Sequence, residues 1–165
     1  MKVNMLRTLF ALFFSIAAAG TSQAAGGHEH DSHASHGHDS STSLQLNDGK
    51  RWKTDAALRK AMANIRRMMA ASVNDIHESR FSSKRYSELS RKIEGEVGHI
   101  IRNCKLDPKA DAQLHLIVAE LMAGTEHMAG KAKDSSPESG AIKVIGALEK
   151  YATYFDDPGF KPIAH

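Results

Sequence analysis

The sequence predicts an all-α protein, an up-down-up-down antiparallel four-helix bundle at residues 44–165 that follows a disordered N-terminal tail. Three observations predict this fold. Apolar residues recur at spacings of three and four in four successive stretches, as on one face of an α-helix. No stretch shows the period of two that is typical of strands. The links between the stretches are short, which makes sequential helices antiparallel neighbours.

The first predicted helix begins at Thr54, whose side chain can cap an N-terminus, and the second begins near Ser82 or Ser83. The apolar stripe of the first helix consists of Leu58, Met62, Ile65, Met69, Val73 and Ile76. The stripe of the second consists of Tyr86, Leu89, Ile93, Val97, Ile100 and Cys104. Cys104, the sole cysteine, is thus expected to be a buried thiol, with a metal ligand or an intermolecular crosslink as alternatives.

The dipeptide Asp107-Pro108 predicts the start of the third helix, because Asp caps a helix and Pro suits its first position. This helix is expected to end near Met128, and its apolar side consists of Leu114, Ile117, Val118, Leu121 and Met122. Ser136-Pro137 predicts the start of the fourth helix in the same way, and residues 156–159 predict its end. The resulting topology would bring the tail, the turn after Cys104 and the C-terminal residues to one end.

The segment before the first helix contains a turn signal at residues 47–49, with the sequence Asn-Asp-Gly. Leu44 and Leu46 precede this turn and Trp52 follows it. We expect these three apolar side chains to fasten the segment to the bundle.

Residues 1–24 have the features of a secretory signal peptide. Lys2 and Arg7 precede an apolar run, and small residues precede a cleavage position after Ala24 or Ala25. The apolar run is too short to span a bilayer. We therefore expect a periplasmic protein with no stable membrane insertion after cleavage; an uncleaved anchor is the alternative.

The charge of the chain does not favour nucleic-acid binding. The formal charge is +3, and loss of Lys2 and Arg7 with the signal peptide leaves about +1. Acidic and basic residues alternate along the chain, as they do on solvated helix faces. We expect no nucleic-acid partner.

Residues 25–43 are rich in His, Gly, Ser and Asp and contain no large apolar side chain, which is typical of a disordered tail. Its five histidines are His28, His30, His33, His36 and His38. Imidazoles interspersed with carboxylates are suitable ligands for copper or zinc. We expect adaptable, weakly selective metal binding that weakens when the histidines are protonated.

Cleavage after Ala25 would create a more specific site. The mature chain would then begin Gly26-Gly27-His28, in which the amine, two amide nitrogens and the imidazole suit Cu(II) or Ni(II). Cleavage after Ala24 would move His28 to the fourth position and weaken this motif.

The helices carry two further candidate metal sites. The first is formed by His99, His115 and Cys104, with Glu96 and Asp111 one helical turn from the two histidines. Alternatively, these residues form no metal site: Cys104 packs in the core, and the two histidines form hydrogen bonds to carboxylates at the surface. The second candidate set consists of His77, Glu78, Met122, His127 and Met128, whose thioethers would suit Cu(I).

Several enzyme classes are excluded by missing motifs. The chain has no C-x-x-C-H sequence and no His or Met in the fourth helix, so we expect no haem. It has only one Glu-x-x-His pair where a di-iron bundle needs two. Cys104 on an apolar stripe should have a raised pKa and low reactivity. We therefore expect no enzymatic activity; an enzyme that uses Cys104 as its nucleophile is a weaker alternative, which thiol reactivity at neutral pH would test.

Residues 103–124 (NCKLDPKADAQLHLIVAELMAG) and 141–160 (AIKVIGALEKYATYFDDPGF) resemble a group of small exported bacterial four-helix proteins of unassigned function. The overall shape is similar to that of the cytochrome b562 and cytochrome c′ class, without the haem ligands. The resemblance implies a bundle and no catalytic residue.

We expect a protein that binds or buffers copper or zinc and hands the ion to a periplasmic protein partner. The alternative is a structural or interaction protein of the cell envelope with an incidental His-rich tail.

Overall fold

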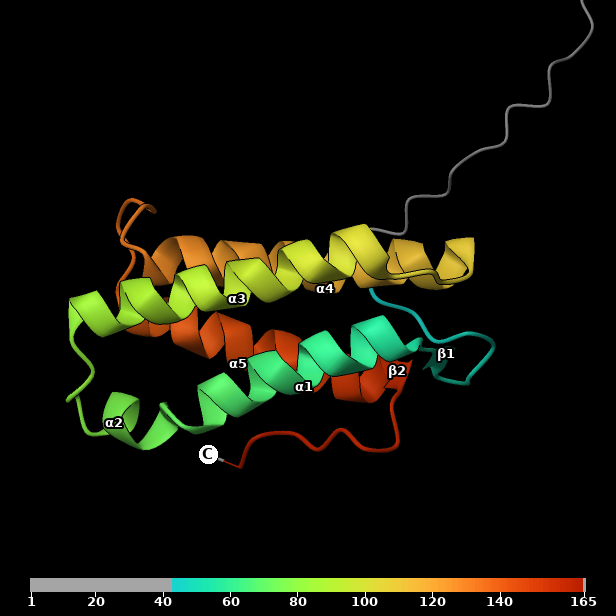
Figure 1. Ribbon diagram of the computed structural model, residues 1–165, viewed down its shortest axis with the longest axis horizontal. Helices are drawn as coiled ribbons and strands as arrows, with labels where there is room; N and C mark the ends of the chain where they lie inside the picture. The colour runs from blue at the N-terminus through green and yellow to red at the C-terminus, as the bar shows by residue number, and fades with distance from the viewer. Residues whose placement is uncertain (1–42, 165) are drawn as a thin grey trace, which may run out of the picture. The chain divides into compact units, whose positions relative to one another are not determined.

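The computed structural model describes residues 43–164, and this part of the chain is mostly helical (Figure 1). The helices are α1 (Ala56–Ala70), α2 (Val73–His77), α3 (Ser83–Asn103), α4 (Pro108–Met128) and α5 (Pro137–Tyr154). Two short strands, β1 (Trp52–Lys53) and β2 (Phe155–Asp156), pair in parallel. A mostly helical protein is thus confirmed, whereas the prediction of no strand is wrong.

Two predictions lie outside the described residues. These are the signal peptide at residues 1–24 and the His-rich tail, of which only Ser43 is described. The five tail histidines, His28, His30, His33, His36 and His38, belong to this part of the chain.

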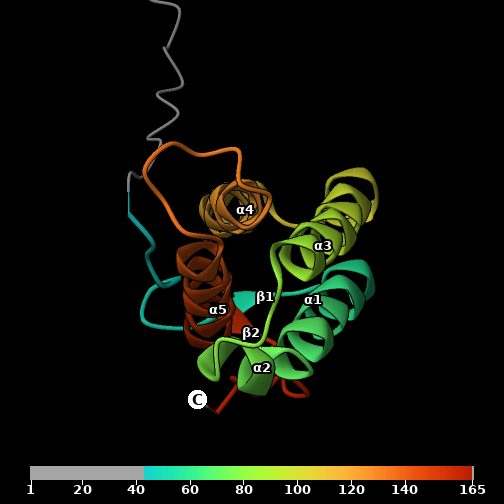
Figure 2. The ribbon, with the colours of Figure 1, turned by 90° about the vertical axis from the view of Figure 1, so that its left-hand side faces the viewer.

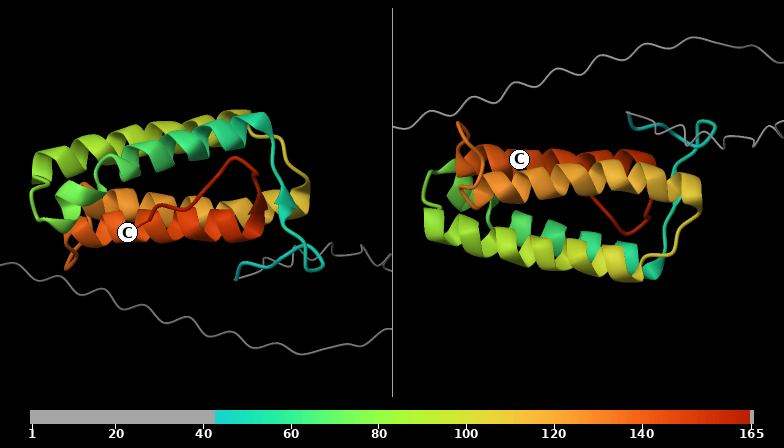
Figure 3. Two further views of the ribbon diagram at one scale, coloured as in Figure 1. Left: turned by 90° about the horizontal axis from the view of Figure 1, so that it is seen from below. Right: turned by 90° about the horizontal axis from the view of Figure 1, so that it is seen from above.

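The four long helices enclose one core (Figure 2). The most extensive contacts are between α4 and α5; α3 contacts both α1 and α4, and α1 contacts α5. Both views in Figure 3 show α1 beside α3 and α4 beside α5. Within residues 43–164, no helix is both long and apolar enough to cross a membrane.

The predicted apolar stripes form this core. All six stripe residues of the first predicted helix are buried, as are the first five of the second. Leu114, Ile117 and Leu121 of α4 are buried, whereas Val118 and Met122 are half-buried. The 3.6-residue periodicity therefore identified the core faces correctly.

Three of the predicted helix starts are confirmed by their caps. The side chains of Ser82, Asp107 and Ser136 accept backbone hydrogen bonds at the starts of α3, α4 and α5. At α1 the prediction of Thr54 is wrong by one residue. Asp55 caps α1 by accepting from the Leu58 amide at 2.7 Å, because the Thr54 hydroxyl instead donates to the Asp156 carbonyl at 2.8 Å.

The first predicted helix is interrupted, so five helices replace the predicted four. α1 ends at Ala70, and α2 begins after Ser72. The Ser72 hydroxyl donates to the Met68 carbonyl at 3.1 Å, an i to i−4 bond of the kind that bends helices. Val73 and Ile76 remain buried beyond the break. The apolar stripe therefore continues although the helix does not.

The segment before α1 is fastened by Trp52. The Trp52 side chain is buried, and its Nε1 donates to the Gln45 carbonyl at 2.7 Å. Leu44 packs against the core, but Leu46 is 41% exposed, so the prediction for Leu46 is wrong. The predicted turn is confirmed, because the amides and carbonyls of Asn47 and Lys50 bond reciprocally across it.

The residues after β2 do not remain at the end of the bundle where α5 ends. Arg66, in the middle of α1, donates to the carbonyls of Lys161 and Pro162, and Ile163 is buried. The chain thus returns along α1, as Figure 1 shows. The expectation that these residues lie beside the turn after Cys104 is wrong, because Ile163 gains burial by packing back onto the bundle.

Candidate functional site

A groove of about 340 Å³ lies between the end of α3 and the start of α4. Its walls include Cys104, Asp111 and His115, whose side chains are of types that can ligate a metal. Ile101, on the same wall as Cys104, is 69% exposed. The groove thus combines a thiol, a carboxylate and an imidazole with an exposed apolar surface.

Cys104 follows the last residue of α3, and its amide donates to the Ile100 carbonyl at 2.9 Å. Its side chain is half-buried and packs against the core. Burial and the nearby carboxylates of Asp55 and Asp111 raise the pKa of the Cys104 thiol to about 12. The expectation of a raised pKa is thus confirmed, and the thiol is protonated at neutral pH.

Asp55 fixes the position of the turn that contains Cys104. One carboxylate oxygen accepts from the Leu58 amide in α1, and the other accepts from the Lys105 amide at 2.6 Å. Burial acts to raise the pKa of Asp55, but these backbone hydrogen bonds outweigh burial and lower it. Asp55 is therefore an anion, and its charge contributes to the raised pKa of the Cys104 thiol.

His115 lies one turn after Asp111 on α4, as the spacing predicted. Its Nδ1 is 2.9 Å from the Asp111 carbonyl oxygen and 3.4 Å from an Asp111 carboxylate oxygen. When Nδ1 carries the proton and donates to Asp111, Nε2 is left with a lone pair for a metal. The imidazole side chain is 71% exposed, so solvent and ions reach it.

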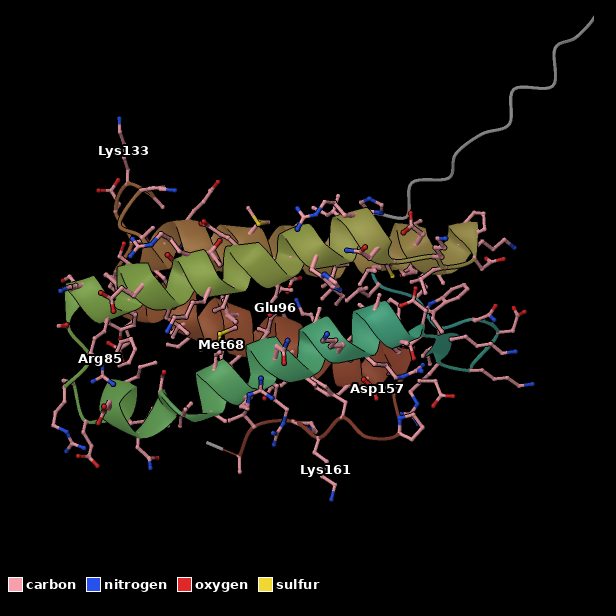
Figure 4. All side chains as sticks on the ribbon, in the orientation of Figure 1. Met68, Arg85, Glu96, Lys133, Asp157 and Lys161 are labelled. Carbon is pink, nitrogen blue, oxygen red and sulfur yellow. The ribbon has the colours of Figure 1, made fainter. Side chains whose placement is uncertain are left out.

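His99 and Glu96 do not line this groove. The Asn103 amide donates to His99 Nδ1 at 3.2 Å, which engages one nitrogen of the ring. Glu96 accepts from Asn64 of α1 at 3.0 Å, and Figure 4 shows the Glu96 side chain on the α1 side of α3. The two predicted ligands from α3 thus do not share the groove with Cys104, Asp111 and His115.

The second candidate set is also dispersed over different environments. His77 is exposed at the end of α2, whereas Met128 is buried in the core. His127 is half-buried, with Nδ1 3.4 Å from the Ser139 hydroxyl. Across residues 43–164, no group of three or more His, Cys, Asp and Glu side chains is already placed to hold a metal ion.

Asp55 is the residue of this site that sequence reasoning did not identify. It precedes Cys104 by 49 positions, and its only local signal, an Asp near a helix start, predicts a cap. Its second hydrogen bond, to Lys105, depends on how α1 and the α3–α4 turn meet.

No protein-family model, curated protein or solved structure matches this chain. The resemblance to small exported bacterial proteins stays a prediction.

Proposed function

We propose that this protein is an exported, non-catalytic protein that binds and buffers copper or zinc in the periplasm. The observation that carries the proposal is the set of five histidines within eleven residues of the N-terminal tail. Neutral imidazoles beside carboxylates are ligands for both ions. The groove adds support, because Cys104, Asp111 and His115 share its walls.

In this proposal the tail captures the ion and the groove holds it. His115 would supply Nε2, Asp111 a carboxylate oxygen and Cys104 a thiolate, a mixed set that zinc accepts. Because the pKa of the thiol is about 12, binding must displace its proton. The side chains must also turn toward one another, since no such group is assembled among the described residues.

Metal analysis of mature protein purified from the periplasm without an affinity tag tests the proposal. We expect bound copper or zinc at one ion or more per chain. Titration of a chain lacking residues 25–42 then separates the two sites. Retained stoichiometric binding that is lost in His115→Ala supports the groove, whereas complete loss assigns binding to the tail alone. Metal-free protein that also fails to bind either ion would refute the proposal.

His99 provides the matched comparison for His115. Both are surface histidines near the same turn, but only His115 lines the groove. We expect His115→Ala to lower the zinc affinity of the tail-deleted chain and His99→Ala to leave it unchanged. Equal effects of the two substitutions would contradict the assignment of the groove.

We further propose the up-down-up-down order of the long helices, which is supported by short links and by the contacts between consecutive long helices. Export rests on the signal-peptide features of residues 1–24, and sequencing the mature N-terminus tests both cleavage positions.

A structural or interaction role in the cell envelope is the second candidate function. The observation that favours it is the exposure of Ile101 at a groove that is also lined by the half-buried Val118, since apolar surface patches can mark interaction sites. Under this alternative, the tail-deleted chain binds no metal and the His-rich tail is dispensable.

A further inference from the structure

A larger hollow, of about 720 Å³, opens between residues 47–55 and the start of α4. It lies at the end of the bundle where Figure 1 shows β1. The hollow is within the size range of small-molecule sites. This hollow is distinct from the groove between α3 and α4, because none of Cys104, Asp111 and His115 lines it.

The rim of the hollow is strongly cationic. It is lined by Lys50, Arg51, Lys53, Lys105 and Lys109. Arg51 forms an ion pair with Asp156 at 3.4 Å. The ammonium groups of the four lysines have no ion-pair partner within residues 43–164, and all four residues are exposed. Four lysines that form no ion pair within the described residues therefore surround one opening.

The two acidic residues that line the hollow are engaged elsewhere. Both carboxylate oxygens of Asp55 accept backbone hydrogen bonds, from Leu58 and Lys105. Asp107 accepts from the Lys109 amide at 3.0 Å as the cap of α4. These carboxylates stabilise the ends of helices, and the four lysines still outnumber the two lining aspartates by two.

Apolar side chains also line the hollow, namely Trp52, Leu106, Pro108 and Ala110. Trp52 and Ala110 are buried, and Leu106 packs against the core, so most of this wall belongs to the packed part of the fold. An apolar wall with charged groups at its edge suits a ligand that has both kinds of surface.

We propose that this hollow binds a small organic anion, with its apolar body against Trp52 and Leu106 and its charged group among the four lysines. Burial of the body supplies a driving force that does not depend on salt. Attraction to exposed lysines is screened by salt, so affinity should fall as ionic strength rises. The site is independent of the proposed metal binding and goes beyond it.

Anilinonaphthalene sulfonate is a suitable probe, because it joins an apolar body to one anionic group. Trp52 is the only tryptophan of the chain and lines the hollow, so a probe bound there must quench its emission. Because energy transfer also reaches more distant probes, the lysine variants locate the binding site. The full-length mature protein is titrated in the presence of EDTA, which removes metal binding from the measurement. We expect saturable quenching of Trp52 that weakens at high salt.

The test variant is Lys53→Gln with Lys109→Gln, which removes two rim charges. The matched control is Lys133→Gln with Lys143→Gln, two exposed lysines that do not line the hollow. Figure 4 shows Lys133 at the opposite end from β1. We expect the test variant to weaken probe binding about tenfold, equivalent to about 1.4 kcal/mol. The control should keep the wild-type affinity, and circular dichroism should show both variants folded.

The proposal is overturned by probe binding that does not quench Trp52, or by equal loss in the two variants. Equal binding of phenylnaphthylamine, which has no charge, would show an apolar site only. Dodecanoate, an anion with an apolar chain, should displace the probe. Displacement by heparin but not by dodecanoate would instead assign the lysines to a polyanionic partner and refute a small-molecule site.

Discussion

Asp55 connects three parts of the molecule through one carboxylate. It caps α1 through the Leu58 amide, holds the α3–α4 turn through the Lys105 amide, and contributes through its charge to the raised pKa of Cys104. The raised pKa of Cys104 could be predicted from its place on an apolar stripe, because burial is its largest cause. The contribution of Asp55 to this pKa could not be predicted from the sequence, because it arises from a tertiary contact.

The thiol of Cys104 should react slowly with iodoacetamide at pH 8, because it is protonated below a pKa of about 12. Asp55→Asn removes the negative charge and keeps a capping side chain. We expect it to lower the pKa of Cys104 while leaving it above 9, since burial persists. The pH–rate profile measured by mass spectrometry checks this.

The control for this substitution is Asp107→Asn, which changes the other aspartate cap of the same region. Asp107→Asn should leave the midpoint of the pH–rate profile of Cys104 unchanged. A rate that rises equally at all pH values in Asp55→Asn would indicate local opening and contradict the electrostatic explanation.

A second residue-scale prediction concerns the buried pair Tyr151 and Asp157. The Tyr151 hydroxyl donates to an Asp157 carboxylate oxygen at 3.0 Å, and both residues are buried. Burial, with the Asp157 charge, raises the pKa of Tyr151. Tyr151→Phe removes the hydroxyl donor and leaves the buried Asp157 carboxylate without this hydrogen bond. We expect a loss of about 1–3 kcal/mol in the free energy of unfolding, measured with urea.

Tyr154→Phe is the matched substitution, because Tyr154 is half-buried on the same helix. It should change the free energy of unfolding by less than about 0.5 kcal/mol. Equal losses for the two variants would show that the hydrogen bond to Asp157 contributes nothing specific.

At the scale of helices, the sequence predicted where most helices start. It did not predict that the first helix is interrupted. A cap depends on the few residues around it, as at Asp107 and Ser136. The break after Ala70 leaves the periodicity of the apolar stripe intact, so periodicity could not reveal it. The pairing of β1 with β2 was equally hidden, because each strand has only two residues.

The close contact of α4 with α5 depends on Gly124 and Gly140. A Cβ at Gly140 would lie 2.5 Å from the Gly124 carbonyl oxygen and 2.6 Å from the Met128 amide nitrogen. We therefore expect Gly140→Ala to lower the free energy of unfolding by about 1–3 kcal/mol through overpacking. Thermal and urea unfolding measure the change.

Gly146 on the same helix provides the opposite case. A Cβ there meets nothing within 4 Å. Gly146→Ala should stabilise the protein by about 0.5–1 kcal/mol, because Ala loses less backbone freedom than Gly on folding. A stabilising Gly140→Ala would show that the two helices can separate without cost.

At the scale of the whole molecule, the described core lies between Trp52 and Ile163. Deleting residues 25–42 should therefore change the free energy of unfolding in EDTA by less than about 0.5 kcal/mol. The same deletion should reduce the number of zinc ions bound per chain, because it removes all five tail histidines. Urea unfolding and metal titration of the two chains check both parts. A deletion that destabilises the metal-free chain by several kcal/mol would contradict the assignment of residues 44–165 as a self-sufficient domain.

The sequence by itself determined the helical class, the core stripes and most helix starts. These features depend on the identity and spacing of residues within one or two turns, as in Leu58, Met62 and Ile65. Only the tertiary structure decided which polar side chains meet. It joined Asp55 to Lys105 and left His99 outside the groove that Cys104 and His115 share. It also placed around one hollow four lysines that form no ion pair in the described part of the chain. Such contacts link residues far apart in the chain, and their geometry depends on how whole helices pack.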